Sequence, residues 1–186
     1  MLRHLADAWL VIVLSLGFGG ALAGVHVSLG ERIRLNQLNE TLSQIPQLVP
    51  GSAGGEAFGE AGGRPVFKAL DGSGQTKGYV IQARGQGFAD VIQVLIGVDA
   101  EARQITGLYV LEQKETPGLG NKITEPAWCA QFKDKPAEAL EAVKGNPAAP
   151  NQVRAVTGAT ISSVSVCQIV NDAVKALKVR RTEGKQ

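Results

Sequence analysis

The chain has little of the residue types that build disulfide frameworks, metal sites and catalytic pairs. Its two cysteines, Cys129 and Cys167, are too few for a disulfide framework and lack the spacing of metal ligands. They could pair if the domain is extracytoplasmic, but two small buried apolar residues is the favoured interpretation. Both histidines, His4 and His26, lie in or near an apolar N-terminal segment, and no nucleophile–base pair is recognisable. We therefore expect no catalytic and no metal-ligating residue.

Charge is the second absence. The formal net charge is only +2, which gives no indication of a nucleic-acid partner. The stretch from Ala8 to Gly30 contains no Asp, Glu, Lys or Arg at all. As a helix with a rise of ~1.5 Å per residue it would span about 34 Å, which is enough to cross a bilayer. Trp9 lies where an interfacial aromatic residue is expected. The sequence therefore predicts a membrane anchor.

Two alternatives concern this apolar segment. Arg3, the apolar run and Ala21-Leu22-Ala23 also resemble a cleavable secretory signal, but the run continues past that site, which favours an uncleaved anchor. Ser15, Gly19 and Ala23 recur at four-residue spacing, as small residues do where helices pack closely in lipid. They indicate either a partner helix in a membrane complex or merely tolerated glycines, and both interpretations stay open.

The segment after the anchor has two parts. Glu31 to Ile45 shows apolar residues near helical spacing, which predicts a helical continuation that Pro46 and Pro50 stop. Gly51 to Gly63 is rich in Gly and Ala and poor in large apolar residues, so we expect a flexible loop there.

An antiparallel meander is predicted next. Four runs rich in β-branched residues are bounded by Gly, Asp or Asn, and they cover Pro65–Leu70, Gly78–Arg84, Asp90–Val98 and Gln104–Leu111. Asp71-Gly72-Ser73-Gly74 and Asp99-Ala100-Glu101 are typical of hairpin turns. Because no helix alternates with these strands, a dinucleotide site of the Rossmann kind is disfavoured.

Helical patterns dominate the rest of the chain. Short helices are expected at Glu125–Phe132, where Trp128 would cover the core, and at Pro136–Val143, followed by a turn-rich connector over Gly145–Gln152. Ile161–Val179 predicts a longer helix with a core-facing stripe made of Val166, Ile169, Val170, Ala173 and Leu177. The fold class expected is α+β, with an N-terminal transmembrane helix followed by an antiparallel sheet with flanking helices.

The start of that last helix is a candidate anion site. TGATISS (157–163) places Thr157 as the N-cap residue, and Gly158 and Ala159 let another group approach the backbone. The free N–H groups of Ile161, Ser162 and Ser163 would point out of the helix start, with several hydroxyls around them. By itself such a run is more often only a turn and a cap.

A second motif follows the meander. ETPGLGNKI (115–123) contains a Pro-Gly turn signal and two glycines that free the backbone for tight conformations, flanked by Lys114 and Lys122. By itself it is a long hairpin exit. With TGATISS about forty residues further on, it resembles the RnfG family, the FMN-binding subunits of the Rnf ion-translocating electron-transport complex, and the related NqrC family of Na⁺-translocating NADH:quinone reductase. The run GQGF (85–88), VLIGVD (94–99) and Trp128 ahead of Phe132 also fit this resemblance.

The resemblance implies a covalent flavin. In that family a phosphoester bond joins the phosphate of FMN to the last Thr of the S/T-G-A-T run, and this threonine corresponds to Thr160. An ApbE-type flavin transferase attaches the FMN, using FAD as its source. The implied phosphate site is formed by Thr157, Gly158, Ala159 and Ser162. The residues implied to line the isoalloxazine are Glu115, Thr116, Gly118, Leu119 and Lys122. Arg154 stands where the family usually has Asp, and Asn121 where it often has Asp. The resemblance implies that the transferase recognises the Asp that Arg154 replaces.

The function implied is that of a membrane-anchored electron carrier in an Rnf-type oxidoreductase of the ferredoxin:NAD class, with other membrane subunits as partners. It would cross a bacterial inner membrane once, with the flavin domain on the periplasmic side. The implied organisation is a cytoplasmic N-terminus (1–7), a transmembrane helix (8–30), a helical extension and Gly-rich loop (31–63), an FMN-binding domain (64–180) and a tail (181–186). The alternatives are a flavin-free structural subunit, in which Arg154 blocks flavin attachment, and an FMN donor domain for a separate periplasmic reductase.

Overall fold

The structure, a computed structural model, describes residues 8–183, so the expected N-terminal segment 1–7 and the last part of the expected tail, 184–186, lie outside the described residues. The chain divides into two units, Met1–Glu40 and Thr41–Gln186. The second unit begins earlier than the domain start at residue 64 that the sequence suggests, because the end of the long helix and one further strand belong to it.

The first unit is the greater part of one helix. Helix α2 runs without interruption over Trp9–Leu48 and contains Pro46. The expectation that Pro46 stops the helix is therefore wrong by two residues. Proline in a last turn removes a single backbone donor, and the turn still closes because the Val49 N–H donates to the Ile45 carbonyl at 2.9 Å.

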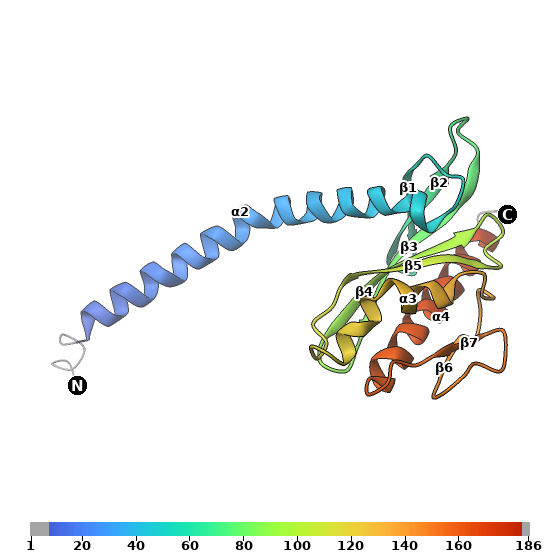
Figure 1. Ribbon diagram of the computed structural model, residues 1–186. Helices are drawn as coiled ribbons and strands as arrows, with labels where there is room; N and C mark the ends of the chain where they lie inside the picture. Colours follow the sequence, from blue (N-terminus) through green and yellow to red (C-terminus); the bar gives the residue numbers. More distant parts are fainter. Residues whose placement is uncertain (1–7, 184–186) are drawn as a thin grey trace. The chain divides into compact units, whose positions relative to one another are not determined.

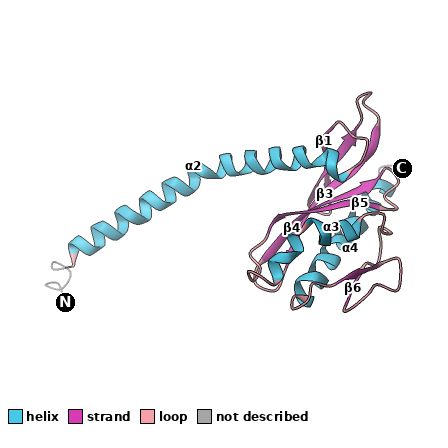
Figure 2. Cartoon of the chain, in the orientation of Figure 1, coloured by secondary structure: helices cyan, strands magenta, loops and turns pink. Residues whose placement is uncertain are grey.

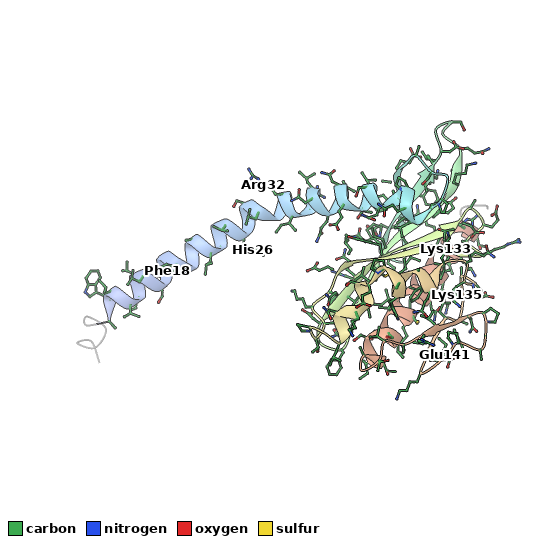
Figure 3. All side chains as sticks on the ribbon, in the orientation of Figure 1. Phe18, His26, Arg32, Lys133, Lys135 and Glu141 are labelled. Atoms are coloured by element: carbon green, nitrogen blue, oxygen red, sulfur yellow. The ribbon has the colours of Figure 1, made fainter. Side chains whose placement is uncertain are left out.

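The N-terminal part of α2 is apolar and uncovered. Its most apolar 18-residue window has a mean hydropathy of 2.1, and none of that window is buried, so this helix is long and apolar enough to cross a membrane. A secretory signal near an N-terminus passes the same test. Figure 3 shows Phe18, His26 and Arg32 projecting from this helix. The finding fits the expected anchor.

The second unit is built on a five-stranded antiparallel sheet in sequential order, drawn in Figures 1 and 2. Its strands are β1 (Gly54–Ala61), β2 (Arg64–Leu70), β3 (Thr76–Gln86), β4 (Val91–Asp99) and β5 (Ile105–Glu112). The four strands predicted from the sequence correspond to β2 to β5, with every end within two residues. The predicted meander is confirmed.

Strand β1 corrects the expected flexible loop over 51–63. Gly54 pairs with Leu70 and Ala61 with Arg64, so the segment is an edge strand of the sheet. Its glycines serve close packing. A Cβ at Gly55 would overlap the Ile45 side chain and come within 2.8 Å of the Lys68 carbonyl oxygen. The low content of large side chains reflects a helix lying against the strand.

The turn between β2 and β3 is closed by Asp71. Its Oδ1 accepts hydrogen bonds from the Ser73 hydroxyl at 2.6 Å and from the N–H groups of Ser73 and Gln75, both at 2.9 Å. These bonds favour the carboxylate form, the Ser73 hydroxyl most of all, and hold the pKa of Asp71 well below its ordinary value. The hairpin turn expected at 71–74 is confirmed.

Both faces of the sheet are covered. Helix α4 (Thr160–Glu183), red in Figure 1, packs on one face. Its predicted core stripe is buried there, together with Val66, Ile81, Val94 and Ile96 of the strands. The end of α2 packs on the other face, through Ile45 and Leu48 against Phe67, Val80 and Leu95. Neighbouring residues such as Val80 and Ile81 point to opposite faces, so each strand supplies two cores.

Short elements link the sheet to α4. They are η1 (Gly120–Thr124), α3 (Pro126–Cys129), η2 (Ala130–Phe132), β6 (Glu141–Val143) and β7 (Gln152–Arg154). The helix expected over 125–132 is confirmed as α3 and η2, and Trp128 is buried with its ring edge-on to Phe132 at 5.1 Å. Strand β6 carries Glu141, labelled in Figure 3, and pairs in parallel with β7.

The helix expected at Pro136–Val143 is wrong. Ala139 has a φ of 50°, which interrupts any helical run. The side chain of Asn171 also accepts from the Leu140 N–H at 2.8 Å and donates to its carbonyl at 2.9 Å. A tertiary contact thus occupies the backbone groups that a helix would use. The expected tail is corrected as well, because α4 continues through residues 181–183.

Both cysteines are free thiols; Cys167 is buried in the core, as the sequence favoured, and Cys129 is partly buried against it. The Cys129 thiol donates to the Ile123 carbonyl at 3.2 Å, and Cys167 on α4 is buried. Burial disfavours the thiolate and raises the pKa of Cys129 to about 11 and that of Cys167 to about 12. Neither thiol has the lowered pKa of a reactive cysteine.

Candidate functional site

A cavity of about 790 Å³ lies at the start of α4, between the two motifs that the sequence singled out. Its size is within the range of small-molecule and cofactor sites. Four stretches of chain contribute its lining: Phe88; Glu115, Thr116, Leu119 and Gly120; Lys144 and Gly145; and all residues of 154–162. Segments that are far apart in the sequence therefore meet around a single hollow.

The structure brings together eight of the ten residues expected to hold the cofactor. Gly118 and Lys122 lie outside the cavity lining: Gly118, with a φ of 77°, shapes the turn, and Lys122 is exposed on η1. Sequence reasoning did not name Phe88, Lys144 or Gly145 as site residues. Phe88 had a signal, since it belongs to the GQGF run, whereas Lys144 lies in a connector without a motif.

The start of α4 differs from the expected cap. The helix begins at Thr160, which puts the N-cap position at Ala159, so Thr157 lies two residues too early to be the N-cap. The Ala159 N–H closes a turn onto the Val156 carbonyl at 2.9 Å, and Gly158 between them has a φ of 82°. Glycine suits that positive φ. Thr157 is consequently an exposed loop residue beside the cavity.

Ser163 holds the loop before the helix against the first turn of α4. Its hydroxyl accepts from the Val156 N–H at 2.9 Å and donates to the Ala159 carbonyl at 3.0 Å, and both bonds are buried. Its own N–H donates to the Ala159 carbonyl at 3.1 Å. The expectation that the Ser163 N–H points freely out of the helix start is therefore wrong. The first-turn N–H groups of Thr160, Ile161 and Ser162 are the ones that α-helical geometry leaves without an intrahelical acceptor.

The hydroxyls of the motif fall into two classes. Those of Ser162 and Ser163 are buried and engaged in hydrogen bonds within the protein. Those of Thr157, which is exposed, and Thr160, which is half-buried, line the cavity and have no hydrogen-bond partner among residues 8–183. Among the hydroxyls of this motif in the described chain, those of Thr157 and Thr160 are therefore the two that are available to a ligand.

Glu115 connects three of the chain segments around the cavity through hydrogen bonds. It is 4% exposed, and its Oε1 accepts from the Ala89 N–H at 3.1 Å. Its Oε2 accepts from the Ser162 hydroxyl at 2.5 Å. Short hydrogen bonds to an ionised acceptor are the strong kind, so the carboxylate fixes the ETPGLG loop against the first turn of α4.

Gly120 makes that approach possible. A Cβ there would lie 2.8 Å from the Glu115 Cβ and 3.1 Å from the Ser162 hydroxyl oxygen. The glycine in this loop is thus required because another side chain occupies the space where its own would be. The same close packing joins the two motifs at Gly158, where an added Cβ would come within 2.9 Å of Leu119.

The cavity lining contains both cations and large apolar side chains. Lys144 and Arg154 are exposed cations in its lining. Arg154 is close to Thr157 in the sequence and pairs with Val143 in the β6–β7 ladder, and Lys144 directly follows Val143. Phe88, Leu119 and Ile161 are large apolar residues in the lining that are 61%, 45% and 57% exposed. Such a lining can hold a molecule with an anionic group at one end and a flat apolar body at the other.

Comparison with known proteins defines the class of this domain. Residues 87–175, which contain both motifs and most of the cavity lining, match the FMN-binding domain family. The chain is 32% identical over 171 residues to the RnfG-type subunit of the ion-translocating oxidoreductase complex of Methanosarcina acetivorans, covering 88% of this chain and 89% of that protein. The chain belongs to the RnfG family.

Further relatives agree with this assignment. The corresponding subunit of the Na⁺-translocating ferredoxin:NAD⁺ oxidoreductase complex of Acetobacterium woodii is 38% identical over 106 residues, covering 55% of this chain and half of that protein. The crystal structure of the NqrC-type subunit of Na⁺-translocating NADH-quinone reductase from Parabacteroides distasonis has a TM-score of 0.55 at 29% identity, covering 62% of this chain and 61% of that one. NqrC of Shewanella oneidensis gives 0.52 at 29% identity, with 58% and 54% covered. The α+β fold expected from the sequence is confirmed.

The residues of the cavity fit FMN. A phosphate group suits the helix start, the two threonine hydroxyls and the two cations, because each of these favours or binds an anion. The exposed apolar residues suit a planar ring system. The cavity size is also adequate for a ligand of this kind.

Proposed function

We propose that this protein carries electrons through an FMN joined by a phosphoester to Thr160, as a membrane-anchored subunit of an Rnf-type oxidoreductase of the ferredoxin:NAD class. The single observation that supports this most is the cavity at the start of α4, which holds both motifs and leaves Thr160 with an available hydroxyl. The flavin, when bound, supplies the redox chemistry.

The protein residues supply position and electrostatics. The first turn of α4 and the hydroxyls of Thr157 and Thr160 would hold the phosphate. Leu119, Ile161 and Phe88 would contact the ring system and exclude water from part of it. Glu115 would keep the two walls of the cavity at a fixed separation, because it is bonded to both the 87–90 segment and α4. The proposal includes no substrate site on this chain.

The partners proposed follow from the family. The relatives are subunits of ion-translocating complexes, so we propose that this chain assembles with other membrane subunits of such a complex. An ApbE-type flavin transferase would attach the flavin from FAD. The flavin-free structural subunit is the outcome that the intact-mass experiment would reveal instead. Co-purification with other membrane subunits would disfavour the separate donor domain.

The attachment site is tested by intact mass. The chain isolated with its native transferase should carry the mass of one FMN less water, and Thr160→Ala should lose that mass while keeping its circular dichroism, since Ala suits a first helical turn. Thr157→Ala is the matched control, because it removes the other available hydroxyl, and it should keep the flavin.

Two results would contradict the attachment proposal. An unmodified wild-type chain would point to the flavin-free subunit. Flavin retained by Thr160→Ala and lost from Thr157→Ala would move the ester to Thr157, and peptide mapping would show this directly. The buried hydroxyls of Ser162 and Ser163 are poorer candidates, because both are already used in the fold.

We further propose a single-pass topology, with the domain from Thr41 onward on the periplasmic face of a bacterial inner membrane. Protease added to intact spheroplasts should then digest the domain, and the mature chain should keep its N-terminal residues. Protection of the domain would reject the orientation. A mature N-terminus at Gly24 would reject the uncleaved anchor.

A further inference from the structure

Two cations are delivered to the cavity by one small structural unit. Strands β6 and β7 run in parallel, and Val143 lies opposite Arg154. Parallel neighbours end at the same edge, so Lys144, which directly follows Val143, and Arg154 leave the ladder side by side. Both line the cavity that contains Thr160.

Arg154 is held in place through its backbone and its side chain. Its N–H donates to Gln131 Oε1 at 2.9 Å, and its carbonyl accepts from Trp128 Nε1 at 2.9 Å. Its Nε donates to the Gly145 carbonyl at 3.2 Å. A guanidinium has five N–H donors, so this contact fixes the group while leaving the outer donors for a ligand.

The two charges are not balanced within the protein. In the part of the chain that the structure describes, no carboxylate lies within ion-pair distance of Lys144 or Arg154. Glu115 is the acidic residue in the cavity lining, and its two oxygens already accept from Ala89 and Ser162. An anion bound in the cavity is what would compensate these cations.

We propose that Lys144 and Arg154 form a phosphate clamp that gives this chain affinity for FMN independently of the covalent bond. The clamp discriminates FMN from riboflavin, which has the same ring system without the phosphate. The inference rests on the proposed function, because it places the flavin phosphate in this cavity. It goes further in assigning phosphate recognition to two residues that belong to neither motif.

The test uses the full-length Thr160→Ala variant in detergent, so that no covalent flavin forms. It is titrated with FMN and with riboflavin, and binding is followed by quenching of flavin fluorescence. At low salt FMN should bind about five- to tenfold more tightly than riboflavin, as expected for two exposed charge pairs. High salt should reduce this ratio, because it screens exposed charges.

Charge substitutions identify the residues responsible. Lys144→Gln together with Arg154→Gln should bring the ratio close to one, while Lys144→Arg with Arg154→Lys should keep most of it. Lys122→Gln is the matched control, since Lys122 is an exposed cation outside the cavity lining, and it should leave the ratio unchanged. Inorganic phosphate should weaken binding of FMN and leave binding of riboflavin unaffected.

The outcomes separate the clamp from the function that it rests on. Equal affinity for FMN and riboflavin, or a ratio unaffected by the double Gln variant, would overturn the clamp while leaving a flavin cavity. If neither flavin binds, the clamp is overturned as well, and the intact mass of the wild-type chain decides separately whether Thr160 carries FMN.

Discussion

The two ends of α4 both adjoin a hollow with arginines on its wall, yet they are built differently. The second hollow, of about 1210 Å³, is lined by residues of β1, β3 and the C-terminal half of α4, including Phe58, Tyr79, Arg180 and Arg181. Thr160 and Arg180 are separated by about 30 Å along the helix. The larger hollow thus lies far from the proposed flavin site.

Two of the cations that line the second hollow, Arg180 and Arg181, lie against aromatic rings. Arg180 lies 4.8 Å from the Phe58 ring centre and donates to the Phe58 carbonyl at 3.0 Å. Lys68 stacks on the same ring at 4.7 Å, and Arg181 on Tyr79 at 5.3 Å. The contacts of Arg180 join the edge strand β1 to α4, and that of Arg181 joins β3 to α4. Lys144 and Arg154 at the other end have no such rings among the residues that the structure describes. The contacts that its cations make, rather than its volume, therefore distinguish the proposed binding site from a hollow whose cations stabilise the fold.

The largest effect expected from this comparison is on stability. Phe58→Ala should lower the free energy of unfolding by about 2–3 kcal/mol, because it removes a half-buried ring and two cation–π contacts. Phe88→Ala, at the rim of the cavity, should cost less than about 0.5 kcal/mol, since Phe88 is mostly exposed. Urea unfolding of the two variants measures both values.

Flavin binding should respond in the opposite order. Phe88→Ala should weaken riboflavin binding to the Thr160→Ala protein, whereas Phe58→Ala should leave it unchanged in the folded fraction. Equal destabilisation by the two substitutions, or loss of flavin binding from Phe58→Ala alone, would contradict a structural role for the second hollow and a flavin-binding role for the first.

An intermediate effect is expected at the buried carboxylate of the cavity. Glu115→Gln should lower the free energy of unfolding by about 1–2 kcal/mol, because a charged hydrogen bond to Ser162 is replaced by a weaker one. A double-mutant cycle with Ser162→Ala should show that the two side chains are coupled. Glu112→Gln, an exposed carboxylate three residues earlier, serves as the control and should be nearly neutral. Additive effects of Glu115→Gln and Ser162→Ala would refute the coupling.

The smallest effect is expected for flavin loading at Arg154. Arg154→Asp should raise loading by a non-cognate transferase by about twofold, because it creates the acidic residue that the family resemblance implies for transferase recognition, and the charge is exposed. Loading by the native transferase should be equal or lower. Lys133→Asp makes the same charge change at an exposed position away from the cavity (Figure 3). Flavin per protein after co-expression is the measurement, and no change with either enzyme would make Arg154 irrelevant to attachment.

Much of the fold could be predicted because its signals are local. The strands β2 to β5 alternate or run apolar between turn residues, and the core stripe of α4 repeats with helical spacing. The failures at β1 and at 136–143 share one cause. At β1, the contact that fixes the structure is the Ile45 side chain, and at 136–143 it is Asn171, and both lie outside the segment concerned. The amino-acid sequence of the segment alone does not predict a contact with such a distant residue.

The features of the candidate site also separate into those that the local sequence predicted and those that depend on tertiary contacts. The sequence by itself determined that TGATISS and ETPGLG occur in one domain, because a motif is a property of consecutive residues. Only the tertiary structure decided which hydroxyls are available to a ligand: those of Ser162 and Ser163 are hydrogen-bonded within the protein, whereas those of Thr157 and Thr160 line the cavity. It also decided that Lys144 and Arg154 line the same cavity. Burial and the meeting of strand ends depend on contacts between distant segments, so spacing along the chain does not contain them.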